Sequence, residues 1–157
     1  MTDLSDLIDH LDLEVGSGLL TQEQLEGLLK SGVVQYNAFA VQAYTLSGAL
    51  GLTLDRDASA QDAVAILLWA LYVYLKGESS RASRSAVVVS NPAGRTDMKN
   101  VEWALAKRAK ELHDERLMPL MKRINMPAVA GEVSANELGD TKDLSLLSFD
   151  DLLRVFS

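Results

Sequence analysis

The two histidines are the residues best suited to acid–base or metal chemistry. His10 lies among aspartates near the N-terminus, and His113 is followed by Asp114 and Glu115. Neither has a second histidine three or four residues away, so the sequence shows no zinc pair. Residues 113–115 could be a fragment of an acid–base site, but we interpret them as the solvated, charged face of a helix.

Other motifs that carry chemistry are missing as well. Gly16-Ser17-Gly18 does not match the G-x-S-x-G nucleophile elbow, and we interpret it as a loop. The segment 91–96 lacks the lysine with which a Walker loop holds phosphate. The chain has no cysteine, which excludes disulfides and thiolate metal sites and suits a reducing compartment. We therefore expect a protein that is not an enzyme and uses no cofactor, although a carboxylate pair assembled only by the fold stays open.

Basic residues gather in the middle of an acidic chain. The net charge is −7 over 157 residues, but residues 27–124 hold thirteen bases against nine acids. The acidic ends, 1–26 and 125–157, are either simply solvated or reach basic surfaces on neighbouring subunits or partners. The bases that could contact a DNA channel or form salt bridges are Arg81, Arg84, Lys107, Arg108 and Lys110. Acidic neighbours favour salt bridges, with non-specific contact to DNA as the alternative.

Two uncharged stretches need positions inside a protein. Residues 63–75 are continuously apolar, but thirteen residues are too few to span a bilayer. Residues 31–54 carry no charge, yet the amides of Gln35, Asn37 and Gln42 would be costly in hydrocarbon. We predict that both stretches form helices buried against protein, with no membrane role. The acidic N-terminus also lacks the features of a secretory signal.

The first element that could position these residues is a short amphipathic helix over 3–11. Leu4, Leu7, Ile8 and Leu11 have the i, i+3, i+4, i+7 spacing of one helix face. A helix this short is marginal in isolation. Its apolar stripe therefore needs a surface, either the body of the protein or a partner.

A long helix is predicted from Thr21 to about Leu50. Thr21 and Gln24 form a capping-box signature at its start. Each helical glycine costs about 1 kcal/mol relative to alanine, a cost usually recovered where another backbone approaches closely. The uncharged side of this helix resembles the centre of an interface. Its glycines and the valines on that side define a predicted subunit-packing set, namely Gly27, Gly32, Val34, Val41 and Gly48.

A second long helix is predicted from a cap at Asp57 or Ser59 to about Ser85. Its first half is apolar on all sides, so it must lie at the centre of a bundle or against another subunit.

An extended segment and a turn are predicted to separate this helix from a third. Val87-Val88-Val89 favours an extended conformation, and residues 91–94 are a turn signal. The third helix should start at Thr96 or Asp97. It should kink or restart near Pro119, which has no amide hydrogen to donate.

Beyond Asn125 the sequence changes to a linker containing proline, glycine, serine and asparagine, and its last fourteen residues are again apolar and acidic. An apolar acidic peptide on a tether is typical of a docking element, although it could instead fold back and close its own bundle. The predicted docking residues are Leu144, Leu147, Phe149, Leu152, Leu153 and Phe156.

These elements predict an all-α fold: a bundle of three long helices with short terminal helices and an extended C-terminal tail. The predicted organisation is an N-terminal amphipathic arm over 1–18, a helical bundle domain over 19–125, and a linker with a docking tail over 126–157.

The layout of residues 20–124 resembles the head–tail connector, or adaptor, proteins of tailed bacteriophages. The matching features are a first helix with Leu28-Leu29-Lys30 and Tyr36, an alanine-rich second helix ending in the Ser/Arg stretch 79–85, the valine-rich segment 87–90, the Pro/Gly turn 91–94 and the charged helix 97–124. The likeness consists of order and pattern, without a diagnostic motif.

The resemblance implies a structural role in the virion. Connectors are small helical bundles that form a ring below the portal, extend the DNA exit channel and present a platform for the next tail component. It implies the portal protein, a tail or neck component and copies of the chain itself as partners, with synthesis in the host cytoplasm. The alternative is a nucleic-acid-handling packaging or regulatory protein similar to a small terminase subunit.

Overall fold

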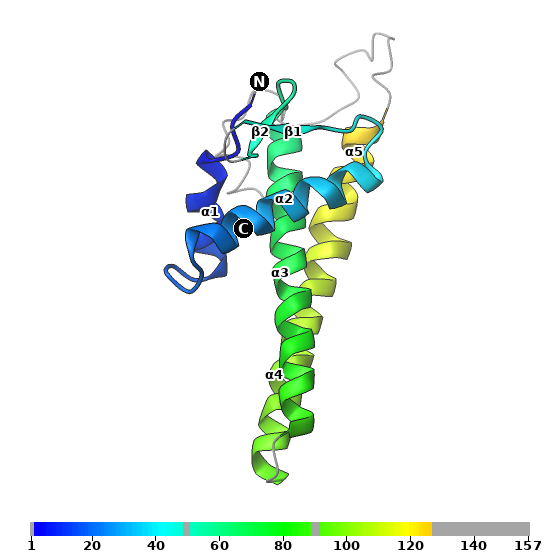
Figure 1. Cartoon of the computed structure of the whole chain (residues 1–157). Helices are drawn as coiled ribbons and strands as arrows, with labels where there is room; N and C mark the ends of the chain where they lie inside the picture. The colour runs from blue at the N-terminus through cyan, green and yellow to red at the C-terminus, as the bar shows by residue number, and fades with distance from the viewer. Residues whose placement is uncertain (1, 49–50, 89–91, 127–157) are drawn as a thin grey trace.

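The computed structural model describes residues 2–48, 51–88 and 92–126, which are mostly helical (Figure 1). The elements follow in the order α1 (Asp6–Val15), α2 (Gln22–Phe39), β1 (Leu46–Ser47), β2 (Thr53–Leu54), α3 (Ala60–Val88), α4 (Pro92–Glu111), the π-helical segment η1 (Leu112–Leu117) and α5 (Met118–Asn125). The prediction of a mainly helical chain is confirmed. The tail 127–157, with the predicted docking residues Leu144 to Phe156, lies outside the described residues.

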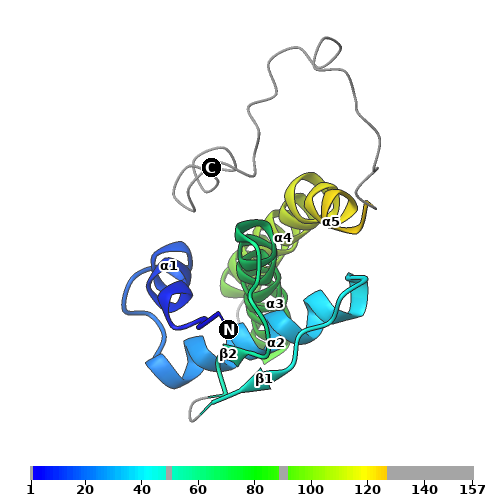
Figure 2. The ribbon, with the colours of Figure 1, turned by 90° about the horizontal axis from the view of Figure 1, so that it is seen from above.

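The helix α3 is the axis of the structure (Figures 1 and 2). α4, η1 and α5 run back along it in the opposite direction, whereas α2 crosses it and α1 lies on the same side as the start of α2. The C-terminal half of α3 and most of α4 lie side by side, and their far ends extend beyond the other elements as a two-helix hairpin, which we call the hairpin arm. Only α3 and α4 are therefore aligned over their length, and α2 is a crossing helix rather than a third parallel member.

Burial on all sides makes α3 the centre of the fold, as its sequence predicted. Ser59 and Asp62 exchange capping bonds at its start, where the Asp62 amide donates to Ser59 Oγ at 3.2 Å. Every residue from Val64 to Leu71 is buried. A helix apolar all round needs neighbours on every side, and α1, α2, α4, η1 and α5 supply them.

The N-terminal segment packs on the body of its own chain. Leu4 and Leu11 are fully buried and Leu7 nearly so. The Leu4 amide donates to the Leu52 carbonyl at 3.0 Å, and the Leu54 amide donates to the Thr2 carbonyl at 2.8 Å. The sequence left open whether this apolar stripe lies on the body of the protein or on a partner. In the structure it lies on the body.

The predicted extension of α2 to about Leu50 is wrong, because α2 ends at Phe39. Ala40 has an extended backbone, and the Asn37 side chain both donates to the Tyr44 carbonyl and accepts from the Tyr44 amide, each at 2.8 Å. Local bonds of this kind compete with helix propagation. The following residues form an antiparallel pair, β1 and β2, in which Leu46 faces Leu54.

Gly48 belongs to this hairpin and not to a helix, so its predicted helical position is also wrong. Its φ of +86° lies in the left-handed region that favours glycine. A Cβ there would stand 2.8 Å from Thr53 Oγ1. The residue is therefore needed for the strand connection.

Two predictions around the tip of the hairpin arm fail as well. Val87 and Val88 complete α3 instead of being extended, and α4 begins at Pro92 instead of Thr96 or Asp97. The β-preference of valine is weak compared with tertiary context. Proline suits the first helical position because the amide it lacks has no helical partner there. Val89 and Asn91 lie outside the described residues.

The predicted kink at Pro119 takes the form of a change in helix type. The π-helical residues Leu112–Leu117 end immediately before α5, whose first turn holds Pro119. Because proline cannot donate the backbone bond that an α-helix needs at that position, the preceding turn widens. Leu117, Leu120 and Met121 are nevertheless buried against the core.

We expect the Gly32→Ala and Gly27→Ala variants to shift stability in opposite directions. A Cβ at Gly32 would lie 2.6 Å from the Ile66 carbonyl oxygen and 3.0 Å from the Ala70 amide, whereas a Cβ at Gly27 meets nothing within 4 Å. Overpacking should cost Gly32→Ala about 1–3 kcal/mol, and helix propensity should give Gly27→Ala up to about 1 kcal/mol. Urea unfolding followed by circular dichroism measures both, and equal midpoints would contradict the close α2–α3 approach.

Candidate functional site: a groove between α2 and α3

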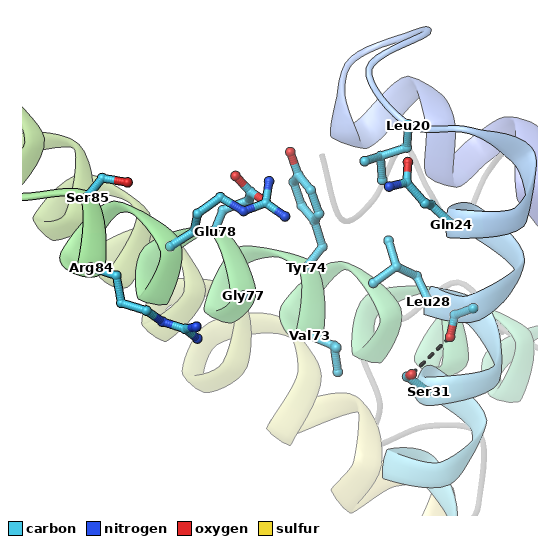
Figure 3. Close-up of a pocket in the computed structure, with 12 residues that line it drawn as sticks. Leu20, Gln24, Leu28, Ser31, Val73, Tyr74, Gly77, Glu78, Arg84 and Ser85 are labelled. Carbon is cyan, nitrogen blue, oxygen red and sulfur yellow. Dashed lines mark hydrogen bonds and ion pairs between the residues drawn. The ribbon is translucent and has the colours of Figure 1, made fainter. Parts of the chain in front are cut away.

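A groove opens where the N-terminal half of α2 diverges from α3 (Figure 3). Its volume is about 560 Å³, within the roughly 300–1,000 Å³ of ordinary ligand pockets. Its apolar lining consists of the partly buried side chains Leu20, Leu28, Val73 and Tyr74. In Figure 3, Leu20, Gln24 and Leu28 lie on one side of this space and Tyr74 of α3 lies on the other.

Two glycines keep this groove wide. Gly27 of α2 and Gly77 of α3 both line it, and a Cβ built at either position would meet no atom within 4 Å. Neither glycine is therefore required for close packing within the described structure. Sequence reasoning singled out Gly27 for subunit packing and missed Gly77, since the groove exists only once the two helices cross.

Two arginines give the far end of the groove a positive rim. Arg81 Nη1 lies 2.9 Å from Glu78 Oε1, in an ion pair whose arginine side chain is 76% exposed. Such exposed pairs contribute only about 0.2–1 kcal/mol, so the guanidinium can exchange partners. Arg84 is exposed and makes no ion pair with any residue that the structure describes. The groove thus combines an apolar floor with donors for an anionic group.

The phenol of Tyr74 adds a neutral polar group to the same surface. Burial raises its pKa, and the nearby Glu78 carboxylate raises it further. The hydroxyl is consequently protonated at neutral pH and can donate a hydrogen bond.

A polar pocket of about 540 Å³ surrounds Asp62 near the C-terminal end of α2. Tyr36 donates to one carboxylate oxygen of Asp62 at 2.6 Å, and Tyr44 donates to the other at 2.8 Å. The Ser59 amide and hydroxyl donate to the second oxygen at 3.0 and 2.8 Å. These bonds join α2, the loop before β1 and the start of α3.

The Asp62 carboxylate is held in its ionised form. Burial alone would raise its pKa, but the bonds from Tyr36, Ser59 and Tyr44 outweigh burial and lower the pKa below its ordinary value of 3.8. The pKa values of Tyr36 and Tyr44 are raised, mainly because the phenols are buried and also because each donates a hydrogen bond to the Asp62 carboxylate. With both oxygens engaged, the carboxylate acts as an anchor rather than as a proton donor. Sequence reasoning missed it, although Ser59-x-x-Asp62 before an apolar run is a visible capping signature.

The histidines are placed apart from each other. His113 is partly buried in η1, with its ring 6.0 Å from that of Trp69 and 5.3 Å from that of Tyr72. Its Nδ1 lies 2.7 Å from Asp114 Oδ1. The expected solvated face holds for Asp114 and Glu115, which are exposed, while His113 packs on aromatic rings. Within the described ranges no cluster of three or more potential metal ligands occurs.

The predicted basic residues are exposed on the hairpin arm and at its base. Arg81 and Arg84 lie on α3 and border the groove. Lys107 Nζ lies 3.7 Å from Glu111 Oε1 and 5.5 Å from the centre of the Trp103 ring. Arg108 and Lys110 are exposed in the last turn of α4. Arg81 and Lys107 thus each make one exposed ion pair, and the role of the five bases stays a prediction.

The remaining members of the predicted subunit-packing set behave differently from one another. Gly32 packs on α3 of its own chain. Val34 and Val41 are 63% and 80% exposed, so their contact with another subunit stays a prediction. Other large apolar side chains are exposed too, namely Leu13, Leu19, Phe39, Val101, Trp103 and Met126.

Comparison with known proteins gives no relative for this arrangement. No protein-family model, curated protein or solved structure matches the chain. None of the helices in the described ranges combines the length and the apolar character needed to cross a bilayer.

We expect Asp62→Asn to lower stability at pH 7 by about 1–3 kcal/mol, because charge-assisted bonds to two tyrosines and Ser59 are weakened. The folded state lowers the pKa of Asp62, so its contribution is fully present above the ordinary pKa and is lost as the pH falls through the folded value. The stability gap between wild type and variant should therefore shrink below about pH 4.

Urea midpoints measured from pH 7 to pH 2.5 test this expectation. Asp9→Asn removes an exposed carboxylate on α1 and should change stability by no more than about 0.5 kcal/mol. A gap between wild type and Asp62→Asn that stays constant with pH would show that the carboxylate charge is not what stabilises the cluster.

Proposed function

We propose that this chain is a head–tail connector subunit of a tailed-bacteriophage virion, forming a ring with its own copies between the portal and the tail and lining the DNA exit channel. The observation that carries the proposal is the exposure of large apolar side chains on two separate parts of the structure. A ring subunit needs two different complementary surfaces, because each copy presents one to the preceding neighbour and the other to the next.

The first surface lies at the C-terminal end of α2, and we call it the α2-end surface. Val34, Phe39 and Val41 are 63%, 46% and 80% exposed there. Sequence reasoning had already noted that this side of the helix carries no charge, as in the centre of many interfaces.

The second surface lies on the hairpin arm, and we call it the arm surface. Trp103 of α4 is 67% exposed and defines this surface, whereas Val101, which is 48% exposed, is two residues earlier and so points to another side of the helix. Tryptophan is enriched among residues that dominate binding energy at interfaces. The arm projects away from the body that holds the α2-end surface (Figure 1), so it can reach an adjoining subunit. This geometry supports a head-to-tail contact between copies.

The proposed partners are the portal, a tail or neck component and other copies of the chain. Passing DNA would contact the exposed bases at most non-specifically, since the net charge of the chain is −7. The C-terminal residues Leu144 to Phe156 are proposed to dock on one of these protein partners, after they leave any site that they occupy on their own chain. Assembly would take place in the virion neck after synthesis in the host cytoplasm.

We expect Trp103→Ala and Val41→Asp each to weaken assembly on portal rings by at least about tenfold, because loss of a hot-spot side chain costs about 2 kcal/mol or more. The measurement is co-sedimentation with purified portal rings of a tailed phage, followed by electron microscopy of the rings. Both side chains are exposed, so the free energy of unfolding of the monomer, measured with urea, should change by no more than about 0.5 kcal/mol.

Leu13→Asp is the matched control for these variants. Leu13 is 70% exposed but lies on α1, away from both proposed surfaces. Wild-type protein that never binds portal rings would refute the connector function, and equal weakening by Leu13→Asp would refute the two-surface geometry.

Nucleic-acid handling, as in a small terminase subunit, is the second candidate. The observation in its favour is the exposed basic cluster Lys107, Arg108 and Lys110 at the base of the hairpin arm. Acidic residues dilute it, and Lys107 already pairs with Glu111. The connector is therefore the better supported function.

We expect only weak retention of the protein on double-stranded DNA at low salt, lost at physiological salt, because few phosphates would be neutralised. Filter binding across a salt series measures this. Retention at moderate salt that the triple variant Lys107→Glu, Arg108→Glu, Lys110→Glu removes would favour the second candidate. Lys99→Glu, Lys122→Glu, Arg123→Glu is the control, because it makes the same charge change at other exposed positions.

A further inference from the structure

We infer that the groove between α2 and α3 is the docking site for the apolar acidic segment 144–156 of the same chain. The inference does not depend on the proposed neck function. It assigns an occupant to a surface that the described residues leave open, so the groove would be an intramolecular binding site for the C-terminal segment.

The groove is built to receive side chains from outside the described core. Its apolar lining residues Leu28, Val73 and Tyr74 are only partly buried. Gly27 and Gly77 face open space in it, although each costs its helix about 1 kcal/mol relative to alanine. Neither glycine allows a close contact within the described structure that would offset this loss of helix stability. An inserted apolar segment would cover the exposed backbone of both helices and bury the apolar floor.

The C-terminal segment matches the groove in apolar pattern. Phe149, Leu152, Leu153 and Phe156 have the i, i+3, i+4, i+7 spacing that places side chains on one face of a helix. Binding of an amphipathic helix in an apolar groove is a recurrent mode of peptide recognition, and its anchors have this spacing.

The segment also matches the groove in charge. Residues 126–157 carry six acids against two bases, and three of the acids, Asp143, Asp150 and Asp151, flank or interrupt the apolar positions. The groove offers Arg84, which makes no ion pair with the described residues, and Arg81, whose pair with Glu78 is exposed. Opposite charges at the rim would fix the direction in which the segment lies.

The tether between α5 and the segment is long enough. α5 ends near the start of α3, because Asn125, Gln61 and Asp62 line the same pocket. At a rise of about 1.5 Å per residue, Gly77 lies about 24 Å further along α3 than Gln61. The linker 126–143 has eighteen residues, so it spans at most about 60 Å and as a coil averages about 23 Å.

The match between coil length and span favours the segment of the same chain over that of a second copy. A linker whose average length equals the distance to be bridged gives an effective concentration on the order of millimolar. A neighbouring chain in dilute solution cannot compete with that. Any partner that takes residues 144–156 must therefore displace them from the groove.

Disulfide trapping in the full-length protein tests the inference, because the natural chain contains no cysteine. The test variant carries Gly27→Cys in the groove and Ser148→Cys in the tail segment. The control carries Val41→Cys with the same Ser148→Cys. Val41 is 80% exposed and its amide bonds to Asn125, so it lies near the start of the tether. If the tail met the surface only by random collision, a cysteine at position 41 would form the disulfide faster than one at position 27.

We expect the groove pair to form an intrachain disulfide at least tenfold faster than the control pair, seen as a faster-migrating monomer on non-reducing gels. The rate should not change with protein concentration. Adding Arg81→Glu with Arg84→Glu, or Gly77→Leu to fill the groove, should slow it at least fivefold. Gly77→Leu has open space for its side chain, and circular dichroism checks that each variant keeps its helices.

Equal trapping rates for the groove and control pairs would overturn the inference. So would disulfides that form between chains, because they would assign the groove to a second copy. Neither result bears on portal binding, which is measured separately.

Discussion

The rest of the structure depends on the burial of α3 from Val64 to Leu71 on every side. A helix with no solvated face in this stretch must be covered by several elements at once. Two of the covering elements are short: α1 has ten residues, and α5 has eight and follows a π-helical segment. Each would be marginal alone, so their stability comes from the surface that α3 gives them. Past Leu71 that continuous burial ends, and after the buried Leu75 α3 continues beside α4 as the hairpin arm.

Much of this fold could be predicted from the sequence because the deciding signals are local. The Thr21–Gln24 capping box, the apolar run of α3 and the restart at Pro119 each act over a few residues. The failures share a different cause. Asn37 ends α2 by bonding to Tyr44, seven residues further on, and no local propensity encodes that contact. Val87 and Val88 stay helical because α4 packs beside α3, which outweighs their weak β-preference.

The candidate site was harder to predict, because glycine takes three different roles between residues 27 and 48. Gly32 permits a close approach to Ile66, Gly48 supplies a positive φ in a strand connection, and Gly27 leaves space open. In sequence all three resemble costly residues inside one helix. Only the crossing of α2 and α3, and the early end of α2, separate these roles. Gly77 drew no attention because its partner surface belongs to another element.

The crossing at Gly32 also links the two pockets on α2. Residues before the crossing line the groove, whereas Tyr36 after the crossing bonds to Asp62. α2 is one continuous helix of eighteen residues, so a single element carries the groove lining, the contact of Gly32 with Ile66 and Ala70, and Tyr36. The bonds that hold Asp62 therefore fix the direction of the whole helix, including the half that borders the groove. The groove lining and the Asp62 cluster thus lie on opposite sides of one crossing, and both are built on the close approach that Gly32 permits between α2 and α3.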